Sequence, residues 1–238
     1  MNLFYSPCII PPSHHFEREE STHIIRVLRL KEGDQIHLTD GKGALYLCDI
    51  LVADPKRCEV SLHASLLLDR IAPPLHIAIA PTKNTNRFEW FLEKSTEIGI
   101  DTITPLICSR SERTGIKTER FQKVLIAAMK QSIKAWLPEL REPVSFNEII
   151  HKPFMGQKFI AYCETGAEEL LQKSFQKGIP ALILIGPEGD FSPGEVAEAI
   201  REGFIPVSLG KSRLRTETAG VVACVMMQIV NSDNNHEA

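Results

Sequence analysis

The chain has 238 residues, of which 43% are hydrophobic and 24% are charged, the composition of an ordinary globular protein with ample material for a core. No apolar run approaches the roughly 18 residues of a membrane span, which excludes a membrane-spanning protein. The formal charge of −3 excludes a protein coated in positive charge, although a nucleic-acid enzyme needs only a local basic face.

The cysteines are scattered along the chain, without a C-x-x-C pair or a histidine spacing suited to zinc. The N-terminus also lacks the basic segment and apolar stretch of a signal peptide. We therefore expect reduced thiols in a cytoplasmic protein, with neither a disulfide nor a structural metal. The cysteines concerned are Cys8, Cys48, Cys58, Cys108, Cys163 and Cys224.

Residues 1–72 are typical of a small β-domain. A short helix is expected from Ser21 to Leu30. Alternating apolar residues from Asp34 to Ser65, interrupted by an Asp-Gly-Lys-Gly turn, then predict three strands of a meander or small barrel. The stiff sequence Ile71-Ala72-Pro73-Pro74 cannot continue a strand ladder, so we place the boundary between domains 1–72 and 73–238 there.

In the second domain the pattern changes to strands that alternate with helices. This alternation predicts an α/β fold with a mostly parallel sheet and helices on both faces. Ligands of such sheets bind beyond the carboxyl ends of the strands. The expected strands are 75–80, 102–107, 158–162 and 181–186, and the expected helices are 87–98, 119–136 and 168–177.

Two segments near the C-terminus each combine a buried strand, a glycine-bearing loop and a helix start. In the first, a loop begins at Gly186, and Ser192 precedes Glu195 by three residues, the spacing of a capping box, with Pro193 at the first helical position. In the second, a basic loop leads to Thr216, the expected N-cap of a helix that is apolar enough to be buried on most faces. Two such loops at neighbouring strand ends suit a nucleotide-like ligand.

The first of these loops excludes the commonest nucleotide sites. It matches neither G-x-G-x-x-G nor G-x-x-x-x-G-K-[ST], and the carboxylates of Glu188 and Asp190 disfavour a phosphate. A simple tight turn is one interpretation. A ligand with a positive centre, or a neutral sugar and base, is the other.

Basic residues gather at several of the expected strand ends. Lys211, Arg213 and Arg215 lie within five residues, and they indicate either a solvated loop or a site for a phosphate backbone. The loops after strands 75–80 and 102–107 add Lys83 and Arg87, and Arg110 and Arg113. In the first domain, the three-residue spacing of His23, Arg26 and Arg29 predicts a basic helix face that contacts RNA.

Several of these segments together resemble one family, the bacterial 16S rRNA uridine N3-methyltransferases of the RsmE type, within the SPOUT class. The resemblance covers nearly the whole chain, and the last two of its motifs are highly specific together. The motifs are HIIRVLRL (23–30), Lys83 and Arg87 with EKSTEIG (93–99), SRSE (109–112), KQS (130–132), IGPEGDFSPGE (185–195) and LGKSRLRTETA (209–219).

The resemblance implies a PUA-like β-barrel domain followed by a SPOUT domain whose C-terminal chain forms a deep trefoil knot. It implies that the two C-terminal loops hold S-adenosylmethionine, whose positive sulfonium suits the acidic first loop. It further implies a homodimer that acts on 16S rRNA. The residues expected to bind the cofactor are Ile185, Gly186, Pro187, Glu188, Gly189, Leu209, Gly210, Leu214 and Thr218.

For methylation of N3 of a uridine, the imide proton must leave and charge develops on the uracil oxygens. We expect Arg215 and Arg110 to stabilise that charge and Glu217 to accept the proton, although an acidic residue in a first helical turn also suits the helix dipole. The expected RNA contacts are His23, Arg26, Arg29, Lys83, Arg87, Arg113, Lys211 and Arg213.

Two other functions remain open from the sequence. One is a catalytically silent assembly factor that binds rRNA and retains the fold, which the intact IGPEG and TETA loops disfavour. The other is a SPOUT methyltransferase that acts on tRNA or on another base. The match of the HIIRVLRL segment favours the rRNA enzyme.

Overall fold

The computed structural model describes residues 2–70, 73–162 and 169–232. The chain divides into two compact units. The first comprises Met1–Arg70 with Met129–Leu137, and the second comprises Ile71–Ala128 with Pro138–Ala238. Within the described residues, no helix is long and apolar enough to cross a membrane. Of the expected features, Ile71 and Ala72 at the domain boundary, Cys163, Glu168 at a helix start and the C-terminal residues 233–238 lie outside the described residues.

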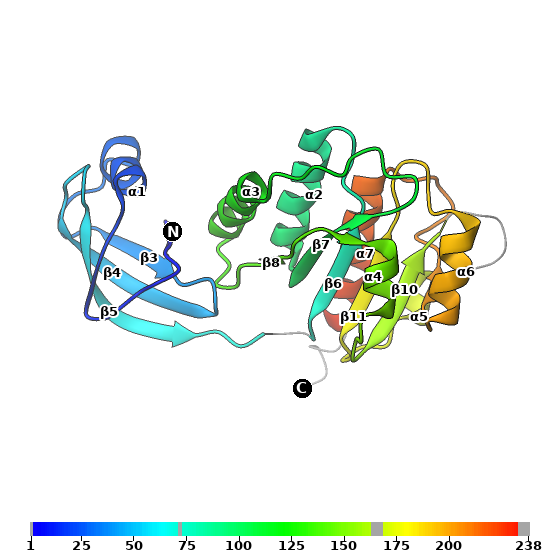
Figure 1. The fold of residues 1–238 in the computed structure, drawn as a ribbon. Helices are drawn as coiled ribbons and strands as arrows, with labels where there is room; N and C mark the ends of the chain where they lie inside the picture. Colours follow the sequence, from blue (N-terminus) through cyan, green and yellow to red (C-terminus); the bar gives the residue numbers. More distant parts are fainter. Residues whose placement is uncertain (1, 71–72, 163–168, 233–238) are drawn as a thin grey trace. The chain divides into compact units, whose positions relative to one another are not determined.

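The first unit is built on a five-stranded sheet with the order β1-β3-β4-β5-β2 (Figure 1). The strand β1 runs parallel to β3, and the other neighbours are antiparallel. The expected three-strand meander is therefore confirmed as β3-β4-β5, and two short strands extend it. The strands are β1 (Leu3–Tyr5), β2 (Ser13–His15), β3 (Gln35–Thr39), β4 (Ala44–Val52) and β5 (Glu59–Leu67).

The turn between β3 and β4 forms as its sequence predicts. The carboxylate of Asp40 accepts hydrogen bonds from the amides of Lys42 and Ala44, at 2.7 and 3.2 Å. Gly41 has a φ of 71°, which a glycine adopts without strain. Buried side chains from β1, β3, β4 and β5 fill the core of this unit beneath the turn, among them Phe4, Ile36, Leu38, Ile50 and Val60.

The helical segment of the first unit differs from the single helix expected at Ser21–Leu30. The helix α1 (Arg18–Thr22) begins earlier and continues into a π-helix, η1 (His23–Val27), in which the Leu28 amide bonds the His23 carbonyl. A π-helix repeats over more residues per turn than an α-helix. A shared face for His23, Arg26 and Arg29 therefore no longer follows from their three-residue spacing.

The helix α3 (Thr118–Gln131) ends before the expected position at Trp136, so that part of the prediction is wrong. The chain turns at Ile133, where φ is 55°, and then joins the first unit. There the Gly43 amide donates to the Ala135 carbonyl at 2.9 Å, and the Trp136 indole donates to the Leu68 carbonyl at 2.9 Å. These long-range hydrogen bonds outweigh the helical preference of this segment.

The second unit contains the predicted parallel sheet. Its strand order is β12-β10-β11-β6-β7-β8, with β9 paired to the end of β7, and all these pairs are parallel. The sheet confirms the α/β prediction. Its strands are β6 (Leu75–Ile79), β7 (Thr102–Ile107), β8 (Glu139–Leu140), β9 (Val144–Ser145), β10 (Gln157–Ala161), β11 (Ala181–Ile185) and β12 (Ile205–Val207).

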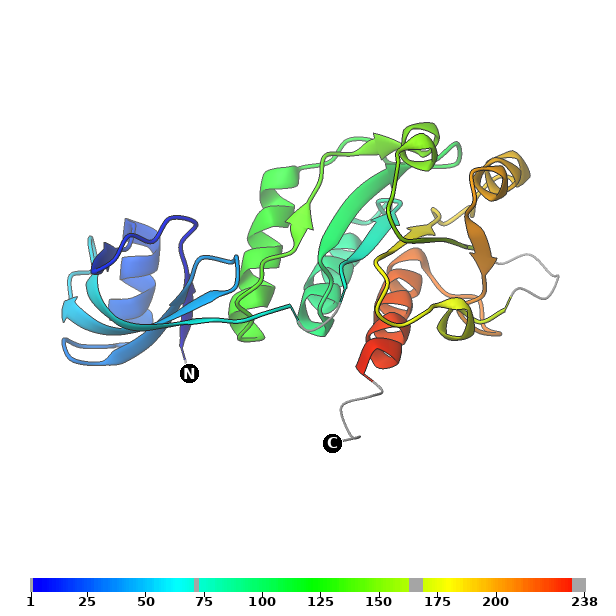
Figure 2. The same ribbon diagram turned by 90° about the horizontal axis from the view of Figure 1, so that it is seen from below.

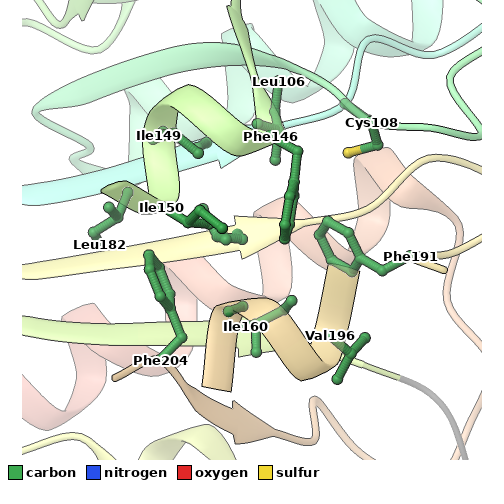
Figure 3. Packing of buried hydrophobic residues seen from close by; sticks show 14 residues of the cluster. Leu106, Cys108, Phe146, Ile149, Ile150, Ile160, Leu182, Phe191, Val196 and Phe204 are labelled. Atoms are coloured by element: carbon green, nitrogen blue, oxygen red, sulfur yellow. The ribbon is translucent and has the colours of Figure 1, made fainter. Parts of the chain in front are cut away.

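Helices cover both faces of this sheet, as expected from the alternation (Figures 1 and 2). On one face, α4 (Phe146–His151) and α6 (Pro193–Arg201) pack on side chains such as Ile160 and Leu182 (Figure 3). On the other face lie α2 (Thr85–Ile98), the short α5 (Leu171–Ser174) and α7 (Thr216–Ser232).

The long C-terminal helix returns from the edge of the sheet to its centre. It follows the edge strand β12 and then packs against α2, β6 and β11. An added Cβ at Gly220 would lie 2.6 Å from the ring of Phe91 and 2.8 Å from Ile79, both fully buried. The missing side chain of Gly220 therefore sets how closely α7 approaches α2 and the sheet.

A buried histidine makes the stability of the second unit depend on pH. His76 is 7% exposed, and its Nε2 lies 2.7 Å from the Thr104 hydroxyl. Burial, aided by the charge of Arg141, lowers its pKa from 6.5 to about 4. A lowered pKa contributes stability above pH 6.5 that is lost as the pH falls towards 4.

We expect the free energy of unfolding to fall by about 2 kcal/mol more between pH 7 and pH 5 in the parent protein than in His76→Asn, which does not titrate in this range. Urea unfolding at the two pH values measures the difference. Equal losses in both proteins would contradict this role of His76.

Candidate functional site

Three strand-end loops of the second unit meet at the carboxyl edge of the sheet. The loop after β6 donates from the Lys83 amide to Glu188 at 3.0 Å, in the loop after β11. The loop after β7 reaches the same segment through Arg110, whose guanidinium donates to the carbonyls of Gly189 at 2.9 Å and Phe191 at 3.4 Å. The convergence expected from parallel strands is therefore present.

The carboxylate of Glu195 ties the loop after β7 to the start of α6. It accepts from the amide and hydroxyl of Ser109, each at 2.8 Å, and from the amide of Ser192 at 2.8 Å. Ser192 and Glu195 form the predicted capping box, with Pro193 in the first turn. Burial by itself would raise the pKa of Glu195, but these hydrogen bonds hold it below its ordinary value. The ionised side chain thus fixes both segments.

A buried aromatic ring supports the loop after β11 from below. Phe191 is 1% exposed and packs against Phe146 of α4, with ring centroids 5.6 Å apart (Figure 3). An added Cβ at Gly186 would lie 3.1 Å from the Phe191 ring, tighter than an ordinary contact. Gly186 therefore allows the backbone of this loop to lie directly on the core.

A first pocket of about 620 Å³ lies between the loop after β11 and the loop after β12. This size suits a small-molecule ligand. Its lining combines small residues with the acidic residues Glu188 and Asp190 and the basic residues of the second loop. The lining residues are 161–162, 185–188, 190, 208–216 and 219.

A second, more open pocket of about 500 Å³ lies beside it, between the start of α2 and the start of α7. Asn86, Arg87 and Trp90 line it from α2, and Glu217 and Thr218 from α7. Arg215 lines both pockets. Two ligands in these pockets would therefore both lie next to Arg215.

The carboxylate of Glu217 is unusual because it is buried and incompletely bonded. The residue is 6% exposed, and Oε1 lies 3.8 Å from Arg87 Nε. The other oxygen, Oε2, is buried and has no hydrogen-bond partner among the described residues. A buried carboxylate oxygen without a donor is costly, so this site favours a ligand that supplies one.

Comparisons with known proteins agree on one family. A family model for an RNA methyltransferase domain matches residues 70–228, and one for an RNA methyltransferase PUA domain matches residues 16–62. The chain belongs to this RNA methyltransferase family. It is 33% identical to a ribosomal RNA small subunit methyltransferase E of Synechocystis sp. over 84% of this chain and 68% of the relative.

Solved structures of similar proteins have the same fold as this methyltransferase. A probable rRNA methyltransferase of Porphyromonas gingivalis is 43% identical, with a TM-score of 0.92 over 98% of this chain and 99% of that one. A putative methyltransferase of Legionella pneumophila, solved in complex with S-adenosylmethionine, is 29% identical, with a TM-score of 0.85 over 95% and 96%. The fold of each unit therefore matches a solved family member.

Most residues expected to bind the cofactor of this methyltransferase gather around the first pocket. Of the nine, seven line it, including Gly186, Gly210 and Leu214. The other two lie elsewhere. Thr218 lines the second pocket, and Gly189 offers its carbonyl to Arg110.

The predicted basic residues fall into two groups. Lys83 pairs with Glu112 at 2.8 Å, and Arg113 donates to the Lys83 carbonyl at 3.3 Å and the Gly115 carbonyl at 3.2 Å. These two therefore already have partners within the protein. Lys211 and Arg213, in contrast, are exposed at the rim of the first pocket, and no ion pair engages them among the described residues.

The structure adds residues that the sequence patterns did not indicate. Tyr162 and Ser208 line the first pocket directly after β10 and β12, where the strand-end rule could have found them. Trp90 lines the second pocket one helical turn after Asn86 and Arg87. No group of three or more His, Cys, Asp or Glu side chains in the described part of the chain could hold a metal ion, and no disulfide joins any two of the five described cysteines.

Proposed function

We propose that this protein transfers a methyl group from S-adenosylmethionine to N3 of a specific uridine in the 16S rRNA of the small ribosomal subunit. The proposal rests mainly on the two adjacent pockets, which share Arg215. One pocket suits a methyl donor, and the other contains a buried carboxylate that suits the acceptor. The relatives named as small-subunit rRNA methyltransferases support the substrate class, and we assign the reaction to the cytoplasm, where ribosomal RNA is found.

The first pocket fits S-adenosylmethionine by size and chemistry. The backbone of the segments 185–189 and 209–214 would hold the adenine and ribose, and Gly210, with a φ of 126°, keeps the loop backbone accessible. Carboxylates at the pocket attract the sulfonium, as the acidic loop predicted. The bound cofactor supplies a methyl group on a positively charged sulfur, which becomes a neutral thioether when the methyl group leaves with its bond electrons remaining on sulfur.

The residues of the second pocket would prepare the acceptor. N3 of uridine carries an imide proton, and its lone pair forms the new bond to the methyl carbon once that proton leaves. Glu217 Oε2 is the proton acceptor. Arg215 stabilises the negative charge that develops on the uracil oxygens, since its fork of donors suits a planar anionic edge. Because N3 is hidden in a paired base, the nucleotide must be unpaired or flipped out.

For Arg110 we propose a structural role in place of the catalytic one expected from the sequence. Its guanidinium holds the carbonyls of Gly189 and Phe191, so it shapes the loop that lines the first pocket. We expect Arg110→Ala to weaken binding of S-adenosylmethionine by about tenfold, the effect of losing roughly 1.4 kcal/mol of charge-assisted hydrogen bonding. Calorimetry measures this affinity. Unchanged affinity for S-adenosylmethionine with a reduced turnover rate would contradict this role and support a catalytic role for Arg110.

We assign RNA binding to both units. The exposed Arg26 and Arg29 of the first unit, with Lys211 and Arg213 beside the pocket, contact phosphates of the RNA. His23 lies 3.8 Å from Glu20 and is a weaker candidate for such a contact. Lys83, Arg87 and Arg113 serve chiefly to hold the loops and Glu217, since they have the partners described above. We propose that residues 1–72 form an RNA-binding domain and residues 73–238 the methyltransferase domain. The segment Met129–Leu137 packs with the first of these.

The proposal includes a trefoil knot and a homodimer. The return of the chain from β12 at the sheet edge to α7 beside β6 and β11 agrees with a C-terminal segment threaded through a loop. The helix α7 carries half-exposed apolar side chains at Val222 and Met226 and an exposed one at Ile229. Their four- and three-residue spacing forms a stripe that a second subunit would cover, bringing its own groups to the active site.

Calorimetric titration with S-adenosylmethionine, followed by methylation of small-subunit RNA with labelled cofactor, tests the proposed activity. We expect saturable binding and incorporation of label at one uridine. Binding without any incorporation would contradict the enzyme and favour an assembly factor. Incorporation into tRNA alone would contradict the substrate class.

A further inference from the structure

We propose that the second pocket is the binding site of the target base, in which the uracil ring stacks on Trp90 and its N3–H faces Glu217 Oε2. This arrangement selects uracil against cytosine. The inference deepens the proposed function and rests on it. Trp90 and the base selectivity are its new elements.

Glu217 needs a hydrogen-bond donor, which uracil has and cytosine lacks at N3. The Oε2 atom is buried and without a partner, whereas Arg87 lies near the other oxygen at 3.8 Å. Uracil has a hydrogen at N3 and can donate it to this carboxylate. Cytosine has only a lone pair at N3, so two acceptors would face each other in a buried site. A site built for a donor discriminates strongly against an analogue that lacks it.

Trp90 offers an exposed aromatic surface on which a base can stack. A large indole that is 41% exposed lies on the wall of the same pocket, while Phe88 and Phe91 on the same helix are buried in the core. Stacking of a base on an aromatic ring is a common device for holding an unpaired nucleotide. Trp90 supplies such a surface at the mouth of a pocket that also contains Arg215.

Arg215 links the proposed base site to the cofactor pocket. Because this residue lines both pockets, a base in the second pocket lies next to a donor in the first. The guanidinium then reaches one of the two uracil carbonyl oxygens that flank N3. The same pocket thus recognises the base by stacking, by the N3 hydrogen and by a carbonyl oxygen.

Trp90 can report on its own occupancy because the chain contains only two tryptophans. In the Trp136→Phe variant, Trp90 is the single tryptophan, and its emission is excited selectively over that of the tyrosines. We would titrate this variant, saturated with S-adenosylhomocysteine, with hexauridylate and with hexacytidylate at the same salt concentration, since both carry equal phosphate charge. We expect hexauridylate to quench the emission saturably and to bind at least tenfold more tightly than hexacytidylate.

The added substitution Glu217→Gln should reduce this preference to less than about threefold, because an amide can offer either a donor or an acceptor. Equal quenching by the two oligonucleotides in the parent variant would overturn the base selectivity. An emission that changes with protein dilution and not with RNA would show that a second subunit covers Trp90, and would overturn the pocket assignment.

Activity separates this inference from the proposed function. We expect Trp90→Ala to raise the KM for small-subunit RNA by about tenfold or more, with unchanged affinity for S-adenosylmethionine, and Trp90→Phe to restore it. Ile200→Ala, which removes a 48% exposed side chain from α6, is the control. Normal kinetics in Trp90→Ala would overturn the inference and leave the methyltransferase intact. No methylation by the parent protein would overturn the proposed function, while the fluorescence titration would still test the pocket.

Discussion

Arg215→Ala should lower the rate of methylation about 10²- to 10³-fold, the usual effect of removing one donor that stabilises developing charge. Arg215 lines both pockets, whereas Arg87, the other arginine of the second pocket, lies near Glu217. Because it is an exposed loop residue, the free energy of unfolding and the affinity for S-adenosylmethionine should change little. Single-turnover kinetics with small-subunit RNA measure the rate.

Arg213→Ala is the matched control for this prediction. It removes the same side chain from the same loop, but Arg213 lines only the first pocket. We expect this variant to raise the KM for RNA, and the rate at saturating RNA to stay near that of the parent protein. Arg215→Lys should recover only part of the lost rate, since a lysine keeps the charge without the planar fork. Full activity of Arg215→Ala would exclude its assignment.

Gly220→Leu should destabilise the protein by at least about 3 kcal/mol, at the upper end of overpacked cores. Even a methyl group at this position would lie 2.6 Å from Phe91 and 2.8 Å from Ile79, both of which are fully buried. For Gly220→Ala we expect a smaller loss, because the higher helix propensity of alanine offsets about 1 kcal/mol. Urea unfolding monitored by circular dichroism measures both.

Gly194→Ala is the control for the loss at Gly220. Gly194 also lies in a helix, but nothing lies within 4 Å of an added Cβ there. We expect its free energy of unfolding to stay within about 1 kcal/mol of the parent value. Since α2 and α7 supply opposite walls of the second pocket, Gly220→Ala should also slow methylation. Equal stability of the two alanine variants would contradict the close approach of α7.

The parts of the fold that follow from local periodicity were predictable. The alternation of strands and helices predicted the parallel sheet, and the Ser192 to Glu195 spacing predicted a capping box that the structure contains. The helix predicted at 87–98 is present as α2, and its Phe88 and Phe91 are 1% and 0% exposed. Each of these features depends on residues close together in the sequence.

The features that depend on distant residues were not predictable in this way. The helix expected to reach Trp136 stops at Gln131, because the residues that follow form hydrogen bonds with the turn between β3 and β4, some ninety residues earlier. The three-residue spacing of His23, Arg26 and Arg29 predicts one face of an α-helix, but His23–Val27 forms a π-helix, which the spacing does not reveal.

The candidate site likewise has a part that was predictable from local sequence and a part that depends on distant residues. The two loops were identified by their glycines and charges, but the pocket that contains Trp90 exists only because α7 returns to α2. Likewise, the placement of Arg110 against two carbonyls of the neighbouring loop depends on the strand order of the sheet.

The most direct test of the proposed activity is mass spectrometry of nucleosides from the 16S rRNA of cells with and without the gene. We predict that 3-methyluridine at one position disappears when the gene is deleted, and that it returns with the parent protein but not with Arg215→Ala. An unchanged level of 3-methyluridine after deletion would contradict the assignment of this protein as the uridine N3-methyltransferase.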